Sequence, residues 1–411
     1  MQFFDGGVCF PKGFTAHGVL AGIKKGRTKE DVALIVSEKQ CNASGVFTKN
    51  LVQAEPVKLS KKHLESRRSY AVIANSGNAN ACTGKQGEEN ALRMASCTAE
   101  ALKKSGLSGI TAQDVLVCST GVIGQQIAVE KIEAKIGELV SGLSKEGNVK
   151  ARQAIMTTDT CYKEGAVQTL IGGKEVRLGT MAKGSGMIHI NMGTMLGFIT
   201  TDCAITSDML DEALKESADA TYNCVSVDGD SSTNDTLLIL ANGMAENPVI
   251  SKKDDNYYLF LDALNALNTQ MARAIAGDGE GATHLIECTV IGAKDVATAR
   301  VLAKSVISSS LVKAAFFGRD ANWGRILCAL GYSGEFFTPA KTSVSFTSEA
   351  GSIVVFDHGT PVNFDEVRAK EILGAKEVKI TVVMEDGEAS GTAWGCDLTY
   401  DYVKINGDYR T

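Results

Sequence analysis

Apolar residues along the chain follow two different periods, and segments of the two kinds alternate. Continuous apolar runs bounded by small polar residues predict buried strands at SYAVIANSG (69–77) and DVLVCSTGVIG (114–124). Apolar residues spaced three and four apart predict a helix after each of these strands. The apolar faces of the two helices carry Leu92, Ala95, Ala99 and Leu102 within 88–104, and then Ile132, Ile136, Leu139 and Val140.

The middle of the chain continues this alternation. GGKEVRLGTMAKGSGMIHI (172–190) predicts a hairpin that turns at Gly172-Gly173. A helix is expected over 208–220, and two strands around a polar loop within 224–243. A further helix over 261–277 carries Leu264, Leu267, Met271 and Ile275 on one face.

The pattern changes after GDGEGAT (277–283), where shorter alternating strands become more frequent. We therefore place a domain boundary near residue 285. An α/β domain spans 1–285, and a smaller α/β domain spans 286–411. The predicted class is mixed α/β, with helices covering sheets.

One apolar run contains an unusual pair. IHINMGTMLGFITTD (188–202) is interrupted by Gly193-Thr194. A threonine in a strand with a glycine at a bulge is the simpler interpretation. The alternative is a nucleophile generated by self-cleavage, because a threonine that becomes an N-terminus gains its own α-amine as a base, with a pKa of about 7.7–8.0. Gly193 has no Cβ, so it can adopt at little cost the distorted backbone that attack on its carbonyl requires.

Composition excludes several classes of protein. The net charge of −6 gives no basic face for nucleic acid. The 11 cysteines include no C-x-x-C pair, which favours reduced thiols and a cytoplasmic protein over a disulfide framework. The N-terminus does not resemble a secretion signal, and no apolar run approaches the ~20 residues of a membrane helix.

Other sites are weakly supported by the sequence. Five histidines, wrongly spaced cysteines and the absence of H-E-x-x-H argue against a metal site. No G-x-S-x-G elbow supports a Ser-His-Asp triad. His189 would lie on the opposite face of a straight strand from Thr194, so we interpret it as structural. AVIANSGNANACTGKQG (71–87) is similar to a phosphate-binding loop, but Gln86 stands where the Mg²⁺-binding hydroxyl belongs.

Wider matches point to a family. AKGSGMIHINMGTMLGFITTDC (182–203) resembles the signature of the ornithine acetyltransferases, also called the arginine-biosynthesis glutamate N-acetyltransferases. Separated matches follow in the same order along nearly the whole chain. They are NSGNANACTG (75–84), CSTGVIG (118–124), MTTDT (156–160), STNDT (232–236), GDGEGAT (277–283), GRDANWGRI (318–326) and CDLTYDYVKINGDYRT (396–411).

The resemblance implies a precursor that cuts itself between Gly193 and Thr194. The α chain (1–193) and the β chain (194–411) then stay together as an α₂β₂ heterotetramer with an αββα-type fold, like the self-processing aminopeptidases. Thr194 carries the acetyl group from N-acetyl-ornithine to glutamate. No bound cofactor or metal is implied, and some members also take acetyl-CoA as a co-substrate.

The resemblance also assigns roles to residues at matching positions. Thr120 and Gly121 correspond to the oxyanion hole, which would stabilise the tetrahedral intermediate of each acyl transfer. The remaining matches are substrate contacts, and they are Thr160, Lys183, Glu280, Asn406 and Thr411. Lys183 suits a substrate carboxylate, and Glu280 suits a substrate amine.

The sequence departs from the family pattern at two places. Gly193 stands where alanine is common, and His189-Ile190 stands where many members have Ala-Pro. Two alternatives remain. A hydrolase of the same fold would resolve the Thr194 ester with water, and a non-catalytic protein would bind nucleotides through the loop at 75–86. The matches in MTTDT and at the C-terminus favour the transferase.

Overall fold

The computed structural model describes residues 1–23, 26, 28–189 and 195–408. In this part of the chain, nine strands form one sheet and eight form a second. The first sheet has the order β1-β6-β7-β9-β11-β3-β4-β5, and β2 pairs with β3. The second has the order β15-β14-β13-β16-β12-β17-β10-β8. The mixed α/β class is confirmed.

Among the strands, the longest is β3, with 16 residues. Those of the first sheet are β1 (Gln2–Phe4), β2 (Phe14–Val19), β3 (Val32–Phe47), β4 (Arg68–Asn78), β5 (Val115–Val122), β6 (Lys163–Ile171), β7 (Lys174–Lys183), β9 (Leu196–Thr201) and β11 (Thr236–Ala241). Those of the second are β8 (Ile188–His189), β10 (Val225–Ser231), β12 (Leu285–Ala293), β13 (Ser343–Ser348), β14 (Gly351–Asp357), β15 (Thr360–Pro361), β16 (Glu377–Val383) and β17 (Ala389–Cys396).

Helices cover both sheets. They are α1 (Glu55–His63), α2 (Gly84–Lys104), α3 (Val129–Ser141), α4 (Asn148–Ile155), α5 (Ser207–Ala220), α6 (Asp255–Gly277), α7 (Val296–Ser308), α8 (Ser310–Phe317), α9 (Trp323–Gly331), α10 (Glu366–Ile372) and α11 (Tyr400–Asp408).

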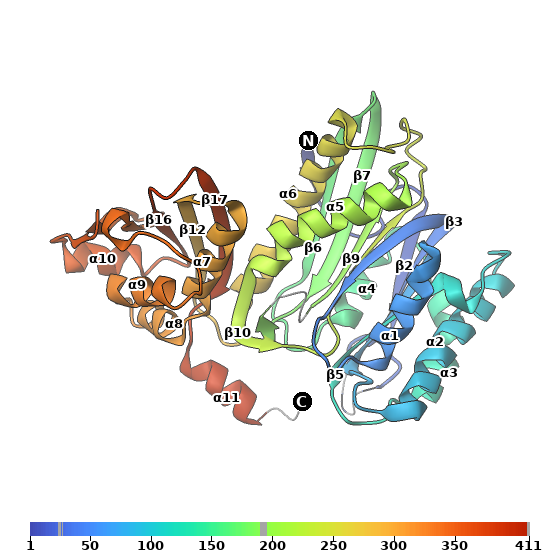
Figure 1. The fold of residues 1–411 in the computed structure, drawn as a ribbon. Coiled ribbons are helices and arrows are strands. Elements are labelled where there is room, and N and C mark those ends of the chain that lie inside the picture. Colours follow the sequence, from blue (N-terminus) through green and yellow to red (C-terminus); the bar gives the residue numbers. More distant parts are fainter. Residues whose placement is uncertain (24–25, 27, 190–194, 409–411) are drawn as a thin grey trace.

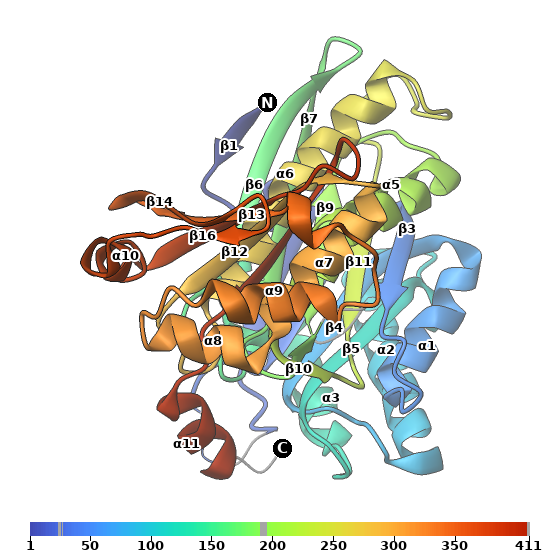
Figure 2. The same ribbon diagram turned by 60° about the vertical axis from the view of Figure 1, so that its left-hand side comes forward.

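The alternation of side chains along β3 shows which helices lie on which face of the first sheet. Ala33 and Ile35 share an apolar cluster with α4, whereas Val32 and Leu34 share one with α2 and α3. Because successive side chains of a strand point to opposite faces, α4 lies on one face of this sheet and α2 and α3 lie on the other. The helix α6 contacts β6 and β7 of the first sheet and also β12 and β17 of the second (Figure 1). Figure 2 shows α7, α8 and α9 gathered together on the second sheet.

The chain crosses between the two sheets twice at neighbouring places. The strand β8 pairs with β10 in the second sheet, while β9 pairs with β11 in the first. The connections 190–195 and 232–235 therefore both run from the second sheet to the first. The interpretation of 188–202 as one strand with a bulge is wrong, because its two halves belong to different sheets. Residues 190–194 themselves lie outside the described residues.

Local predictions compare well with the structure. β6 and β7 form the predicted hairpin, and its turn glycines have φ values of +57° and +78°, as a type I′ turn requires. The expected apolar face of α6 is buried throughout. The strand β12 starts at Leu285, and the second sheet also takes β8 and β10 from the segment before it, so the domain boundary near 285 stays a prediction.

One predicted core residue is wrong. Leu92 is 48% exposed, while its neighbours Ala91 and Met94 are buried. The buried stripe of α2 runs through Ala91, Ala95 and Thr98. Leu92 lies about 100° further round the helix than Ala91, so it faces solvent.

The packing of α6 on the first sheet gives a prediction. Leu264→Ala removes a fully buried side chain, so we expect the free energy of unfolding to fall by about 2–5 kcal/mol. Leu259→Ala on the same helix is the matched control, because Leu259 is 43% exposed. Urea unfolding followed by circular dichroism compares the two variants. Equal losses would contradict the assigned face of α6.

Candidate active site

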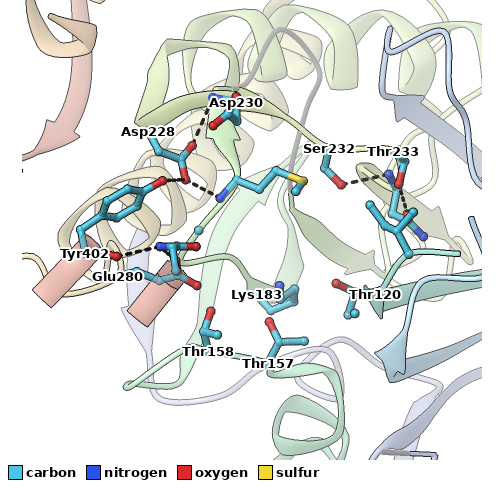
Figure 3. A pocket seen from close by; sticks show the side chains of 16 residues that line it. Thr120, Thr157, Thr158, Lys183, Asp228, Asp230, Ser232, Thr233, Glu280 and Tyr402 are labelled. Carbon is cyan, nitrogen blue, oxygen red and sulfur yellow. Dashed lines mark hydrogen bonds between the residues drawn. The ribbon is translucent and has the colours of Figure 1, made fainter. Parts of the chain in front are cut away.

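A cavity of about 180 Å³ lies beside the connection 232–235. Strands of both sheets and the C-terminal helix contribute to its wall (Figure 3). Its lining residues are Thr120, Gly121, Ile123, Thr157, Thr158, Lys183, Gly186, Met187, Asp228, Asp230, Ser232, Thr233, Asn234, Glu280, Tyr402 and Asn406.

Thr120 and Gly121 reach the cavity because they lie near the end of β5, beside the end of β4. The two strands are parallel, and Gly121 is opposite Gly77. Gly121 has a φ of +132°, and a Cβ at this position would lie 2.4 Å from the carbonyl carbon of Gly77. Only glycine fits such a close approach. The amide of Asn234 donates to the carbonyl oxygen of Ser119 over 2.8 Å, which ties the connection 232–235 to this strand.

Lys183 is a buried cation at the end of β7. It is only 5% exposed, and among the described residues no hydrogen-bond partner of its ammonium group is found. Burial lowers its pKa, and the negative charges of Asp159, Asp235 and Glu280 only partly oppose this effect. An ammonium group held in this way binds an incoming carboxylate without first losing an internal partner.

A buried ion network holds the backbone next to Lys183. The ammonium group of Lys163 lies 2.8 Å from Oδ1 of Asp159 and also contacts Asp278. Asp159 further accepts the N–H groups of Gly184 and Thr157, over 2.7 and 3.0 Å. Burial by itself raises the pKa of Asp159, but the charges of Lys183 and Lys163 outweigh it and lower the pKa to about 2. The carboxylate thus stays ionised and holds the residue that follows Lys183.

The opposite side of the cavity is acidic. Asp228, Asp230 and Glu280 lie there with Tyr402, across the cavity from Thr120 (Figure 3). Gly186 makes room for Glu280, because a Cβ on Gly186 would lie 2.3 Å from its carboxylate. The cavity therefore has a cation on one wall and carboxylates on another. This charge pattern fits a small molecule that carries both a carboxylate and an amine.

The helix α11 closes the acidic side through two hydrogen bonds. The amide of Asn406 donates to Oε2 of Glu280 over 2.8 Å, and the hydroxyl of Tyr402 donates to Asp228 over 3.2 Å. Asp228 also accepts the N–H groups of Met187 and Ile188, over 2.6 and 2.7 Å. One carboxylate thus joins the C-terminal helix to the segment that precedes residues 190–194.

Most of the predicted site residues meet at this cavity. Thr120, Gly121, Lys183, Glu280 and Asn406 all line it, although they come from four distant parts of the sequence.

Thr160 is placed elsewhere. Its hydroxyl donates to Asp278, and it lines a neighbouring cavity together with Cys161 and Arg273. From the same MTTDT motif, Thr157 and Thr158 line the main cavity instead. Gly193, Thr194 and Thr411 lie outside the described residues.

Several residues of the site were missed by the sequence analysis. Asp159 and Asp278 stand inside quoted motifs, but no spacing marked them as partners. Lys163 begins a strand and carries no pattern that distinguishes it from a surface lysine. Asp228 and Tyr402 also had no local signal, because each gains its role only when β10 and α11 are brought together.

The other candidate sites do not reach this cavity. In the described part of the chain, no group of three or more His, Cys, Asp or Glu side chains is placed to hold a metal ion. His189 interacts with the hydroxyl of Ser226 over 3.0 Å and lines a different cavity, and burial lowers its pKa to about 4. In the loop similar to a phosphate-binding loop, Thr83 donates to Asn80 over 2.7 Å. None of the helices within the described ranges is long and apolar enough to cross a membrane.

Comparison with known proteins gives consistent matches. The sequence model of the ArgJ family matches residues 15–411. The arginine biosynthesis bifunctional protein ArgJ of Caldanaerobacter subterraneus subsp. tengcongensis is 51% identical over 411 residues, which covers 100% of both chains. The protein of the same name from Symbiobacterium thermophilum is also 51% identical, over 412 residues and 100% of both chains. A crystal structure of the Bacillus halodurans arginine biosynthesis bifunctional protein is 43% identical with a TM-score of 0.50, and it covers 53% of this chain and 100% of that one.

The buried ion network gives a second prediction. Lys163→Met leaves Asp159 and Asp278 without their shared cation, so we expect the free energy of unfolding to fall by about 3–5 kcal/mol. Lys58→Met removes a lysine whose ion pair with Glu55 is partly exposed. It should change the free energy of unfolding by less than about 1 kcal/mol. Urea unfolding measures both. A Lys163→Met protein as stable as Lys58→Met would show that the network does not stabilise the fold.

Proposed function

This chain belongs to the ArgJ family of arginine-biosynthesis enzymes, and we propose that it transfers acetyl from N-acetyl-ornithine to glutamate through an ester on Thr194. It is an acetyltransferase of arginine biosynthesis. The observation that carries the detailed proposal is the charge pattern of the cavity. Lys183 suits the α-carboxylate that both substrates share, and the acidic wall suits the side-chain ammonium of the ornithine donor.

The position of the residue after Thr194 supports Thr194 as the nucleophile. The carbonyl oxygen of Met195 accepts the N–H of Thr236 over 2.9 Å, directly after the connection 232–235. Three residues of this connection, Ser232, Thr233 and Asn234, line the cavity. Met195, the residue that follows Thr194 in the chain, is thus bound directly beside the segment that lines the cavity.

The proposed reaction has two balanced acyl transfers. The hydroxyl of Thr194 attacks the acetyl carbonyl of the donor, its proton passes to the α-amine, and ornithine leaves with a proton on its nitrogen. The amine of glutamate then attacks the ester, and N-acetylglutamate leaves as the Thr194 hydroxyl regains its proton. Thr120 and Gly121 would supply the hydroxyl and the N–H that stabilise the oxyanion of both steps.

The remaining predicted contacts fit around this centre. We propose that Glu280 and Asn406, which are hydrogen-bonded to each other, contact the distal end of the substrate. For Thr160 the contact would be indirect in the described conformation, because its hydroxyl is directed to Asp278. For Thr411, we keep the role of a substrate contact that the family resemblance implies.

We also propose that the active enzyme is the cleaved form, with chains 1–193 and 194–411 in a cytoplasmic α₂β₂ assembly. The solved relative from Bacillus halodurans supports a two-chain form, because about half of this chain accounts for the whole of that one. The bifunctional names of the full-length relatives support a second acetyl donor, for which the family resemblance suggests acetyl-CoA.

The hydrolase alternative is not favoured. An enzyme of the same fold that released acetate to water would waste the acetyl group, whereas the full-length relatives are named for biosynthesis.

The test of the proposal is Thr194→Ala. Wild-type protein should give two fragments in a denaturing mass spectrum, residues 1–193 and 194–411. Thr194→Ala should remain a single 411-residue chain and show no acetyl transfer, because the nucleophile is absent. Thr201→Ala, further along the same segment, is the control and should be cut. An uncut Thr194→Ala protein with normal transfer would overturn the proposal.

Lys183→Met tests substrate binding. The variant loses the cation but keeps much of the apolar stem, so KM for N-acetyl-ornithine should rise about 10- to 100-fold with a smaller change in kcat. Burial lowers the pKa of Lys183, so the wild-type KM should also rise as pH increases and the ammonium group loses its proton. The variant should lack this alkaline rise. A KM that is unchanged by the substitution would remove Lys183 from the substrate site.

A further inference from the structure

A second cavity, which no step of the proposed reaction uses, lies beside the helix α7. It has a volume of about 620 Å³ and shares no lining residue with the first cavity. Its walls come from α7, β8, the end of α5 and the segment after α9, and α7 and α9 pack against each other (Figure 2). Pockets for small molecules in proteins commonly measure about 300–1,000 Å³. We call this space the α7 cavity.

A single face of α7 forms one wall of the α7 cavity. Residues 297, 300, 301, 304, 305 and 308 line it, and their spacing of three and four places them on one side of the helix. The opposite side carries Leu302 and Val306, which are fully buried in the apolar core. The two cations of this helix, Arg300 and Lys304, therefore both face the cavity.

The guanidinium group of Arg300 has no internal anion to pair with. Among the residues that the structure describes, none forms an ion pair with it or accepts a hydrogen bond from it. The carboxylate of Asp219 also lines the cavity, but its Oδ1 atom accepts the amide of Asn223 over 2.5 Å. Arg300 is thus available to an anion that enters the cavity.

Lys304 adds a second positive charge. Its ammonium group donates to the carbonyl oxygen of Asn223 over 2.9 Å, which is a neutral acceptor. Burial lowers the pKa of Lys304 to about 8, so most of these groups still carry a proton at pH 7. Burial and the charge of Lys304 lower the pKa of His189 to about 4, so this ring is neutral at pH 7. The positive charge of the cavity therefore comes from α7.

Ser308 contributes a hydroxyl group on the same face. Its Oγ atom is shielded from solvent and has no hydrogen-bond partner in the described part of the chain. In contrast, the hydroxyl of Ser305 donates to the carbonyl oxygen of Ala329 over 2.6 Å. Buried polar atoms are usually paired, because an unpaired one loses its hydration without compensation. A ligand oxygen in the cavity would supply the partner that Ser308 lacks.

We propose that the α7 cavity binds a small phosphorylated molecule, whose phosphate group pairs with Arg300 and Lys304. A phosphate group carries a charge of about −1.5 to −2 at pH 7 and has three strong acceptor oxygens. These match the two cations and the free hydroxyl of Ser308. The organic part of the ligand would lie against Val301 and Tyr332, which line the cavity and are 40% and 60% exposed.

Isothermal titration calorimetry with pyrophosphate tests the proposal on the full chain at pH 7 and constant ionic strength. Wild-type protein should show saturable binding at one site. Arg300→Gln should weaken it about 10- to 100-fold, because it removes charge-assisted hydrogen bonds. Lys304→Gln should weaken it in the same direction. The matched control is Lys294→Gln, which lies just before α7, outside the cavity, with a side chain that is 74% exposed.

A second set of variants guards against misfolding and against binding elsewhere. Arg300→Gln should keep the thermal midpoint of the wild type, since its guanidinium group has no internal partner to lose. Arg300→Lys keeps the charge without the planar fork, so it should recover part of the affinity. Lys183→Met removes the cation of the first cavity and should still bind pyrophosphate. Binding that is lost in Lys183→Met and unchanged in Arg300→Gln would place the probe in the first cavity and overturn the proposal.

The remaining outcomes are equally direct. Absence of binding by the wild type at millimolar pyrophosphate would overturn the proposal, and so would equal affinities of wild type, Arg300→Gln and Lys304→Gln. Acetate, whose carboxylate carries one charge, should compete poorly at the same ionic strength, and competition as strong as that of inorganic phosphate would contradict the choice of phosphate. Calorimetry does not use acetyl transfer, so a failure of the proposed function would leave this result unchanged.

Discussion

The ammonium group of Lys163 is the contact on which the arrangement of the site depends. It holds the carboxylates of Asp159 and Asp278, which belong to segments more than a hundred residues apart. Asp159 binds the backbone directly after Lys183, and the carbonyl oxygen of Asp278 accepts the hydroxyl of Ser185 over 2.6 Å. The end of β7 is thereby joined to the loop that carries Glu280. One buried ion network thus joins the side of the cavity that carries Lys183 to the side that carries Glu280.

The network also bears on Lys183, whose ammonium group has no hydrogen-bond partner among the residues that the structure describes. The ammonium group of Lys163 donates a hydrogen bond to Asp159, whereas Lys183 is influenced by Asp159 through its negative charge alone. A buried ammonium group that is not paired with a carboxylate is energetically unfavourable before substrate binds. A substrate carboxylate would pair with this ammonium group and remove the unfavourable burial. The unpaired burial of Lys183 therefore contributes to the affinity of the site for substrate.

Local structure could be predicted from the sequence, while the assembly of the site largely could not. The apolar stripe of α6 and the Gly172-Gly173 turn follow from periods of a few residues, and both appear as expected. The crossing of 190–195 between sheets has no such signal, since strand pairing depends on residues far away in the sequence. Lys183, Glu280 and Asn406, which the family motifs assigned to the substrate site, all line one cavity. The motifs did not reveal Asp159 or Lys163, because no sequence pattern marks two residues that form an ion pair between separate segments. Thr160 shows the same limit, because only the fold turns its hydroxyl toward Asp278.

The attachment of α11 couples the acidic wall to the position of a single helix. Tyr402 and Asn406 bind Asp228 and Glu280, so two of the wall's carboxylates are oriented by one element. Asp228 also accepts the N–H groups of Met187 and Ile188. A displacement of α11 would therefore change the orientation of the acidic wall and the support of the strand β8 at the same time.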